Sequence, residues 1–178
     1  MIEKAKLLGL VISSDMSWSS NTEYMVGRAN HKLWILRRLK RLGATPDDLL
    51  DIYIKQVRSI LEYAVPVWHP SITGEQRLEI ERVQKSAFHI ILGECYRSYT
   101  SSLKALSMAT LHSRRVKLCK KFARKSAKSE KFRHWFKVYS KPSFTRTKPY
   151  QYCPVFSRTV RYEKSPISYL TTILNSAK

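Results

Sequence analysis

Two amphipathic segments near the N-terminus are separated by residues that end one helix and begin another. Residues 20–42 carry apolar side chains at steps of three and four, the period of an α-helix, and Gly43 suits a helix C-terminus. Residues 45–48 (TPDD) then supply an N-cap hydroxyl, a proline for the first helical position and two carboxylates for the positive end of a helix dipole. The sequence therefore predicts two helices joined by a turn, the second of which stops before Pro66.

Similar patterns predict three more helices further along the chain. One begins at Gly74 and ends at Gly93, a short one covers residues 99–107, and a long one covers residues 111–129. The apolar positions expected to face the core of the helix that begins at Gly74 are Leu78, Val83, Ala87, Ile90 and Ile91. On the long helix the expected apolar edge consists of Leu111, Leu118, Cys119, Phe122 and Ser126.

Before the helices, residues 6–12 (KLLGLVI) form a short apolar and β-branched run that ends in a Ser-Ser-Asp turn, the pattern of a strand. We see no second strand nearby, so this one is expected to pair with a partner outside the chain. After the helices, four of the seven prolines fall in the last 37 residues. The predicted fold class is mainly α: a helical bundle with one short N-terminal strand and a Pro-containing basic C-terminal tail, partly disordered.

The charge of the chain is concentrated in its second half. The net charge is +20, of which +3 lies in residues 1–90 and +17 in residues 91–178, where only Glu94, Glu130 and Glu163 are acidic. These cations cannot mostly be paired internally, so a polyanion is the partner expected to relieve their repulsion.

The helix at 111–129 carries the densest part of this charge, with eight cations within 15 residues. An aromatic segment interleaved with cations, residues 131–137 (KFRHWFK), follows it. Phosphate contacts combined with ring stacking suit RNA, single strands or hybrid duplexes, whereas an acidic membrane surface or protein is the alternative. Trp135 and Phe136 fit ring stacking and packing on the core equally well. The residues expected to contact phosphates are Arg114, Lys117, Lys121, Arg124 and Lys128, followed by Arg37, Arg38 and Arg41.

No complete active site is recognisable in the sequence. Asp47 and Asp48 resemble a metal-binding pair, but their place after Thr45 and Pro46 fits helix capping better. The five histidines are scattered, and the chain contains neither a glycine-rich phosphate loop nor a serine-nucleophile motif. Three cysteines at irregular spacing predict reduced thiols. Together with the lack of a signal peptide and of a membrane-length apolar run, they predict a soluble, intracellular protein with no membrane partner.

Several blocks of the sequence resemble, in order, the region that follows the catalytic palm in reverse transcriptases of non-LTR retrotransposons (LINE-type, jockey-like elements). The similarity begins with KLLGLVI at residues 6–12 and DMSW at residues 15–18. The later blocks are residues 33–40, 53–70, 80–85, 165–170 and 174–175. No single block is strong, but their co-linear order across nearly the whole chain makes chance similarity improbable.

The resemblance implies a division of the chain into four parts. Residues 1–18 would be a primer-grip-like strand and turn, residues 19–93 a thumb-like helical bundle, residues 94–138 a basic helical extension, and residues 139–178 the basic tail. Such thumbs hold a template–primer duplex by its backbone, so RNA, an RNA–DNA hybrid or DNA is the implied partner, together with other parts of the polymerase. The palm, with its metal-binding carboxylates and the Mg²⁺ they hold, would precede Met1. This chain by itself would then need no cofactor and carry out no catalysis.

Two other interpretations remain open. The chain could be an independent helical DNA-binding module that presents the helix after residue 46 to a groove, although Asp47, Asp48 and Asp51 would then face phosphates. It could also be a non-functional retrotransposon remnant whose helices cannot bury the surface that a palm would cover.

Overall fold

The computed structural model describes residues 3–139 and 151–176 and is mainly helical, which confirms the predicted fold class. The chain divides into two compact units. Unit 1 comprises Met1–Ala64 and Ile72–Arg114, and unit 2 comprises Val65–Ser71 and Arg115–Lys178. The elements of unit 1 are β1 (Lys4–Leu7), β2 (Leu10–Ser13), α1 (Ser19–Arg41), α2 (Pro46–Ile52), η1 (Tyr53–Arg58), α3 (Ser59–Leu61), α5 (Gly74–Leu92), η3 (Gly93–Cys95) and α6 (Tyr99–Ala105). Those of unit 2 are α4 (Val65–Trp68), η2 (His69–Ser71), η4 (Arg133–Trp135), α8 (Val160–Glu163) and α9 (Pro166–Ser176), while α7 (Leu111–Lys128) begins in unit 1 and continues in unit 2.

The apolar run at residues 6–12 folds as a hairpin rather than as one strand. β1 and β2 pair antiparallel, with Leu7 opposite Leu10, and the two turn residues Leu8 and Gly9 both have positive φ, 47° and 84°. Positive φ at both central residues is typical of two-residue hairpin turns, because it matches the twist of the flanking strands. The strand therefore pairs with residues 4–7 of the same chain, which the sequence analysis did not predict.

The junction between α1 and α2 has the predicted structure. Gly43 adopts a φ of 86°, and the amides of Gly43 and Ala44 donate to the carbonyls of Lys40 and Leu39, closing α1 with the bond pattern of a Schellman motif. The Thr45 hydroxyl then accepts from the Asp48 amide, and the Asp48 carboxylate accepts from the Thr45 amide. This capping box begins α2 and gives Asp48 the structural role that the sequence predicted.

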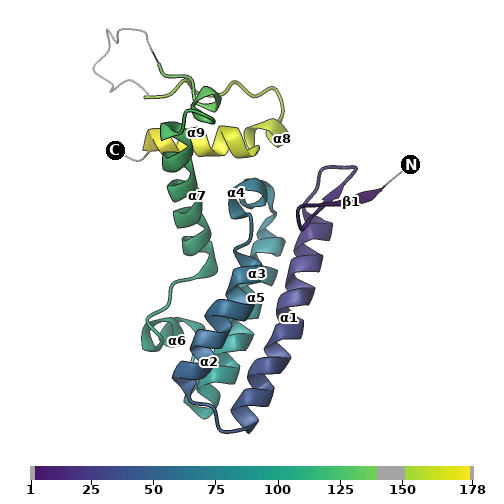
Figure 1. Ribbon diagram of the computed structural model, residues 1–178, viewed down its shortest axis with the longest axis vertical. Helices are drawn as coiled ribbons and strands as arrows, with labels where there is room; N and C mark the ends of the chain where they lie inside the picture. The colour runs from purple at the N-terminus through teal and green to yellow at the C-terminus, as the bar shows by residue number, and fades with distance from the viewer. Residues whose placement is uncertain (1–2, 140–150, 177–178) are drawn as a thin grey trace. The chain divides into compact units, whose positions relative to one another are not determined.

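The core of unit 1 forms where α1 and α5 lie side by side (Figure 1). The fully buried apolar residues contributed by α1, α2, η1, α3 and α5 include Ala29, Leu33, Leu36, Leu49, Tyr53, Val57, Leu61, Ile80, Ala87, Phe88 and Ile91. The prediction that Val83, Ala87 and Ile91 of α5 face the core is confirmed, because all three are buried. The same prediction is wrong for Leu78, which is 58% exposed. Gln76 and Gln84 lie on the buried face, and a pattern based on apolar residues alone does not include them.

Gln84 links several elements of unit 1 through a buried hydrogen-bond network. Its Oε1 accepts from the Tyr53 hydroxyl at 2.6 Å, and its Nε2 donates to the Tyr99 hydroxyl at 2.9 Å and to the Ala109 carbonyl at 3.1 Å. The Tyr99 hydroxyl donates to Glu81, whose Oε1 also accepts the Leu111 amide at 3.0 Å. The network gives hydrogen-bond partners to the buried Gln84 amide and to the buried Tyr53 hydroxyl. Through the Leu111 amide it also holds the start of α7 against α5.

Unit 2 contains more helix than the predicted tail allowed. α9 buries Leu170, Ile173 and Leu174, and α4 and η2 pack against it, with Trp68 fully buried. Pro166 does not interrupt α9 because it occupies the first helical position, where no backbone N–H is needed. Residues 140–150, which belong to the predicted tail, lie outside the described residues.

Candidate nucleic-acid interface

Helix α7 has one buried face and one cationic face. Leu111, Cys119, Ala123 and Ser126 are buried, in agreement with the predicted edge except at Ala123, whereas Leu118 is half-buried and Phe122 is 37% exposed. Burial raises the pKa of the Cys119 thiol to about 12, and the Arg115 cation acts in the opposite direction. The Cys119 thiol is therefore protonated and unreactive near neutral pH.

Arg115 is one of the eight cations of this helix, but it does not lie on the cationic face. Arg115 is fully buried, one turn from both Leu111 and Cys119 on the same face of α7. Helical spacing requires this position, because residues four apart lie on the same face and both neighbours are buried.

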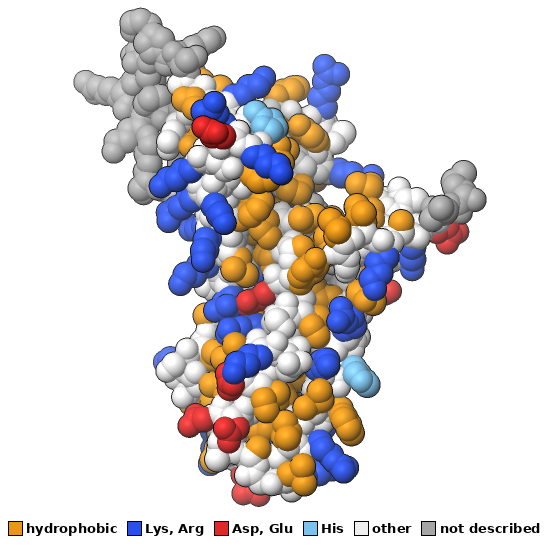
Figure 2. All heavy atoms as spheres, in the orientation of Figure 1, with side chains coloured by type: hydrophobic (Ala, Val, Ile, Leu, Met, Phe, Trp, Pro, Cys, Tyr) orange, Lys and Arg blue, Asp and Glu red, His pale blue; other side chains and the backbone are white. Residues whose placement is uncertain are grey.

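Four of the predicted phosphate-binding residues form a continuous stripe on the opposite face of α7. We call Lys117, Lys121, Arg124 and Lys128 the α7 row. All four are exposed, their spacings of four, three and four residues follow the helical period, and the row is about 16 Å long. None of the 18 residues of α7 is acidic, and within the described residues none of the four forms an ion pair. Figure 2 shows Lys and Arg side chains gathered along the edge where α7 lies.

Arg114, the first residue predicted for this interface, is engaged elsewhere. Its guanidinium makes a two-bond ion pair with Glu62, through Nε to Oε1 and through Nη2 to Oε2 at 3.0 Å. The hydrogen bond with Glu62 raises the pKa of Arg114, and Arg58 approaches the same carboxylate at 3.9 Å. The carboxylate of Glu62 therefore holds the Arg114 guanidinium in place through two hydrogen bonds, and we leave Arg114 out of the α7 row.

The second predicted set, Arg37, Arg38 and Arg41, lies exposed near the C-terminus of α1. Arg37 borders a shallow hollow of about 350 Å³ in unit 1, together with Lys85 and His89 of α5. Lys40, which lies between Arg38 and Arg41 in the sequence, has a structural role instead. Its ammonium donates to the carbonyls of Ile90 and Ile91 at the end of α5.

Neither Lys85 nor His89, which line this hollow with Arg37, was predicted as part of a binding surface. The two residues are four positions apart and exposed on α5, so the helical period could have placed them on one face. That this face adjoins Arg37 depends on the packing of α1 against α5, which the sequence does not specify.

The aromatic segment after α7 combines packing with partial exposure. Phe136 is buried and its ring lies 6.0 Å from that of Tyr152, so its role is to anchor the segment. Trp135 is half-buried, and its ring centroid lies 4.8 Å from that of Phe132. The sequence left open whether Trp135 and Phe136 stack on bases or pack on the core. Phe136 packs, whereas the rings of Phe132 and Trp135 remain partly accessible.

No metal centre is found among residues 3–139 and 151–176, where no group of three or more His, Cys, Asp or Glu side chains comes together. No helix in this part of the chain combines the length and apolar character that a membrane span requires. No protein-family model, curated protein or solved structure matches the chain.

Proposed function

We propose that the chain binds the sugar–phosphate backbone of RNA, an RNA–DNA hybrid or DNA through the α7 row, as a thumb-like and C-terminal part of a LINE-type reverse transcriptase. The observation that carries the proposal is the row itself: four exposed cations in line on a helix without an acidic residue, opposite its buried face. Such a row repels itself unless a polyanion lies along it. The polymerase context rests on the sequence resemblance alone.

The proposed role is binding without polymerisation by this chain alone. Two-metal polymerisation needs carboxylates that are available to hold the ions, whereas the Asp48 carboxylate is used in the α2 capping box. The α7 row also fits recognition of the sugar–phosphate backbone. The ammonium groups of Lys and the guanidinium groups of Arg contact phosphates irrespective of the base sequence. Base-specific recognition of DNA by α2 is disfavoured, because its three exposed acids, Asp47, Asp48 and Asp51, would face phosphates.

The proposal is tested by neutralising the row and measuring affinity by fluorescence anisotropy. The variant carries Lys117→Gln, Lys121→Gln, Arg124→Gln and Lys128→Gln. Its affinity for labelled oligo(U), for an RNA–DNA hybrid and for duplex DNA should fall by about two to three orders of magnitude at roughly 0.1 M salt, because four phosphate contacts are lost.

The matched control removes four exposed cations elsewhere: Arg77→Gln, Lys104→Gln, Arg158→Gln and Lys164→Gln. It changes the net charge by the same amount but should retain most of the affinity. An equal loss in both variants would assign binding to net charge rather than to the row, and full affinity in the row variant would overturn the proposal.

A further inference from the structure

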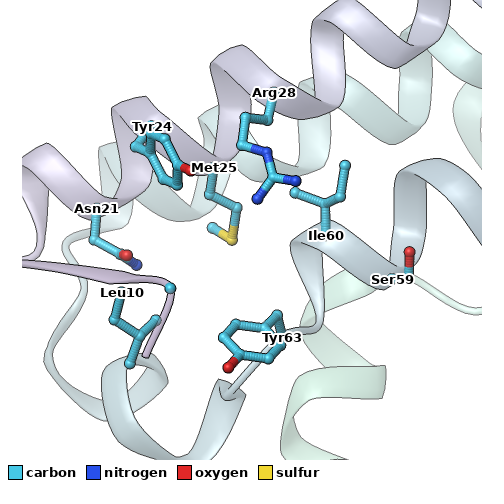
Figure 3. A pocket seen from close by; sticks show the side chains of 9 residues that line it. Leu10, Asn21, Tyr24, Met25, Arg28, Ser59, Ile60 and Tyr63 are labelled. Carbon is cyan, nitrogen blue, oxygen red and sulfur yellow. The ribbon is translucent and has the colours of Figure 1, made fainter. Parts of the chain in front are cut away.

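A separate, mostly apolar pocket lies in unit 1 between the hairpin turn, α1 and α3. Its volume is about 340 Å³, in the size range of sites for small ligands. Leu10, Met25 and Ile60 supply aliphatic and thioether walls, and Tyr63 supplies an aromatic one. In Figure 3 the Arg28 side chain extends from α1 toward the space between Ile60 and Tyr63.

Two cations converge on one tyrosine at the rim of this pocket. The Lys6 ammonium donates to the Tyr24 hydroxyl at 2.7 Å and lies 4.7 Å from the ring centroid, and the Arg28 guanidinium carbon lies 5.6 Å from it. The hydrogen bond from Lys6 lowers the pKa of Tyr24. No acidic residue lines the pocket, and neither Lys6 nor Arg28 forms an ion pair within the described residues. The rim is therefore electropositive and suited to an anion.

The Tyr63 ring gives the pocket a fixed flat wall. Its hydroxyl donates to the Leu8 carbonyl at 2.7 Å, which ties the ring to the hairpin turn, while 52% of the residue stays exposed. A Cβ at Gly9, which also lines the pocket, would lie 3.4 Å from this ring, so the turn packs closely against it. A planar ligand can stack on such a ring, and the Met25 sulfur offers a polarisable contact near it.

We propose that this pocket binds a planar aromatic group that carries a phosphate, as a nucleotide does. The base lies against Tyr63 and Met25, and the phosphate is held by Arg28 and Lys6, with the Tyr24 hydroxyl able to donate a further hydrogen bond. The site goes beyond the proposed function, because the pocket is formed by unit 1 and includes no residue of the α7 row.

The test uses the full chain labelled with ¹³C at the methionine methyl groups and observed by NMR. The sequence holds four methionines, of which Met25 lines the pocket, while Met16 and Met108 do not. AMP should shift the Met25 signal in a saturable way and leave that of Met108 unchanged. Adenosine and inorganic phosphate, each carrying half of the recognised chemistry, should bind at least about tenfold more weakly.

A substitution at the rim checks the role of the cation. Arg28→Gln should weaken AMP binding at Met25 by about tenfold or more, because a charge-assisted contact to phosphate is lost. Arg77→Gln, on the exposed surface of α5 and away from the pocket, is the matched control and should bind AMP as the unmodified chain does.

Three results would overturn the proposal: no saturable shift at Met25, adenosine or inorganic phosphate binding as tightly as AMP, or equal AMP affinity in the Arg28→Gln protein. The ligand series needs no substitution, so it decides the question even if a variant misfolds. Because the readout is a mononucleotide at Met25, its failure is distinguishable from loss of polynucleotide binding by the α7 row.

Discussion

Arg114 and Arg115 are adjacent cations on α7 with different environments, and neither resembles the exposed members of the α7 row. Arg114 is held by Glu62 and Arg115 is fully buried, whereas Lys117 and Lys121 are exposed. The role of each cation therefore depends on its angular position on the helix and on which acids lie near it.

Replacing Arg114 should affect folding more than binding. Arg114→Gln removes both hydrogen bonds to the Glu62 carboxylate, so the free energy of unfolding should fall by about 1–2 kcal/mol, measured by urea denaturation. Affinity for nucleic acid should change less than about twofold. Lys121→Gln should show the opposite pattern, with stability unchanged within about 0.5 kcal/mol and affinity reduced roughly fivefold. If Arg114→Gln lowers the affinity for nucleic acid and leaves the free energy of unfolding unchanged, Arg114 belongs to the binding surface.

The sequence predicts residue roles well where they are local. The capping function of Asp48 follows from its place after Thr45, and the exposure of the α7 row follows from helical spacing. The ion pair of Arg114 could not be predicted, because Glu62 is 52 positions away and is brought near by tertiary packing. The burial of Gln84 has the same cause, since its partners belong to η1, α6 and the loop before α7.

At the scale of elements, helix ends are the best-defined features of the chain. α1 ends at Gly43, α2 begins with the Thr45 capping box, and α5 begins with a second box in which Thr73 and Gln76 cap each other. Each box satisfies backbone amides that the first turn of a helix leaves without partners.

The capping box of α2 can be tested with a single hydroxyl. Thr45→Ala should lower the free energy of unfolding by about 1 kcal/mol, because the Asp48 amide loses its acceptor. Thr45→Ser retains the hydroxyl and should stay close to the unmodified protein in the same urea titration. If the two substitutions are equally costly, the cap does not stabilise α2.

Two elements differ from what the sequence predicts, each for a physical reason. The apolar run at residues 6–12 predicts one strand, whereas the positive φ of Leu8 and Gly9 turns the chain in the middle of that run and pairs residues 4–7 with β2. α9 lies in the Pro-containing tail, for which the sequence analysis predicts no helix, and Pro166 begins this helix. Its apolar positions Leu170, Ile173 and Leu174 already had helical spacing.

At the scale of the whole molecule, at least four of the ten acidic residues in the first half have partners inside unit 1. Asp48 caps α2, Asp51 pairs with Lys55, Glu62 binds Arg114, and Glu81 accepts from Tyr99 and Leu111. The second half has only three acids for twenty basic residues. Apart from Arg114, which pairs with Glu62, and Arg115, which is buried, this excess of cations over acids favours an external polyanion as partner.

The most direct test of the central claim is the salt dependence of nucleic-acid binding by the unmodified protein. Four phosphate contacts from the α7 row predict that log K against log salt falls linearly with a slope of about −3 or steeper, because each contact releases condensed counterions. The row variant should lose about 3 units of that slope. A binding curve that stays flat from low to physiological salt would contradict backbone binding by this chain.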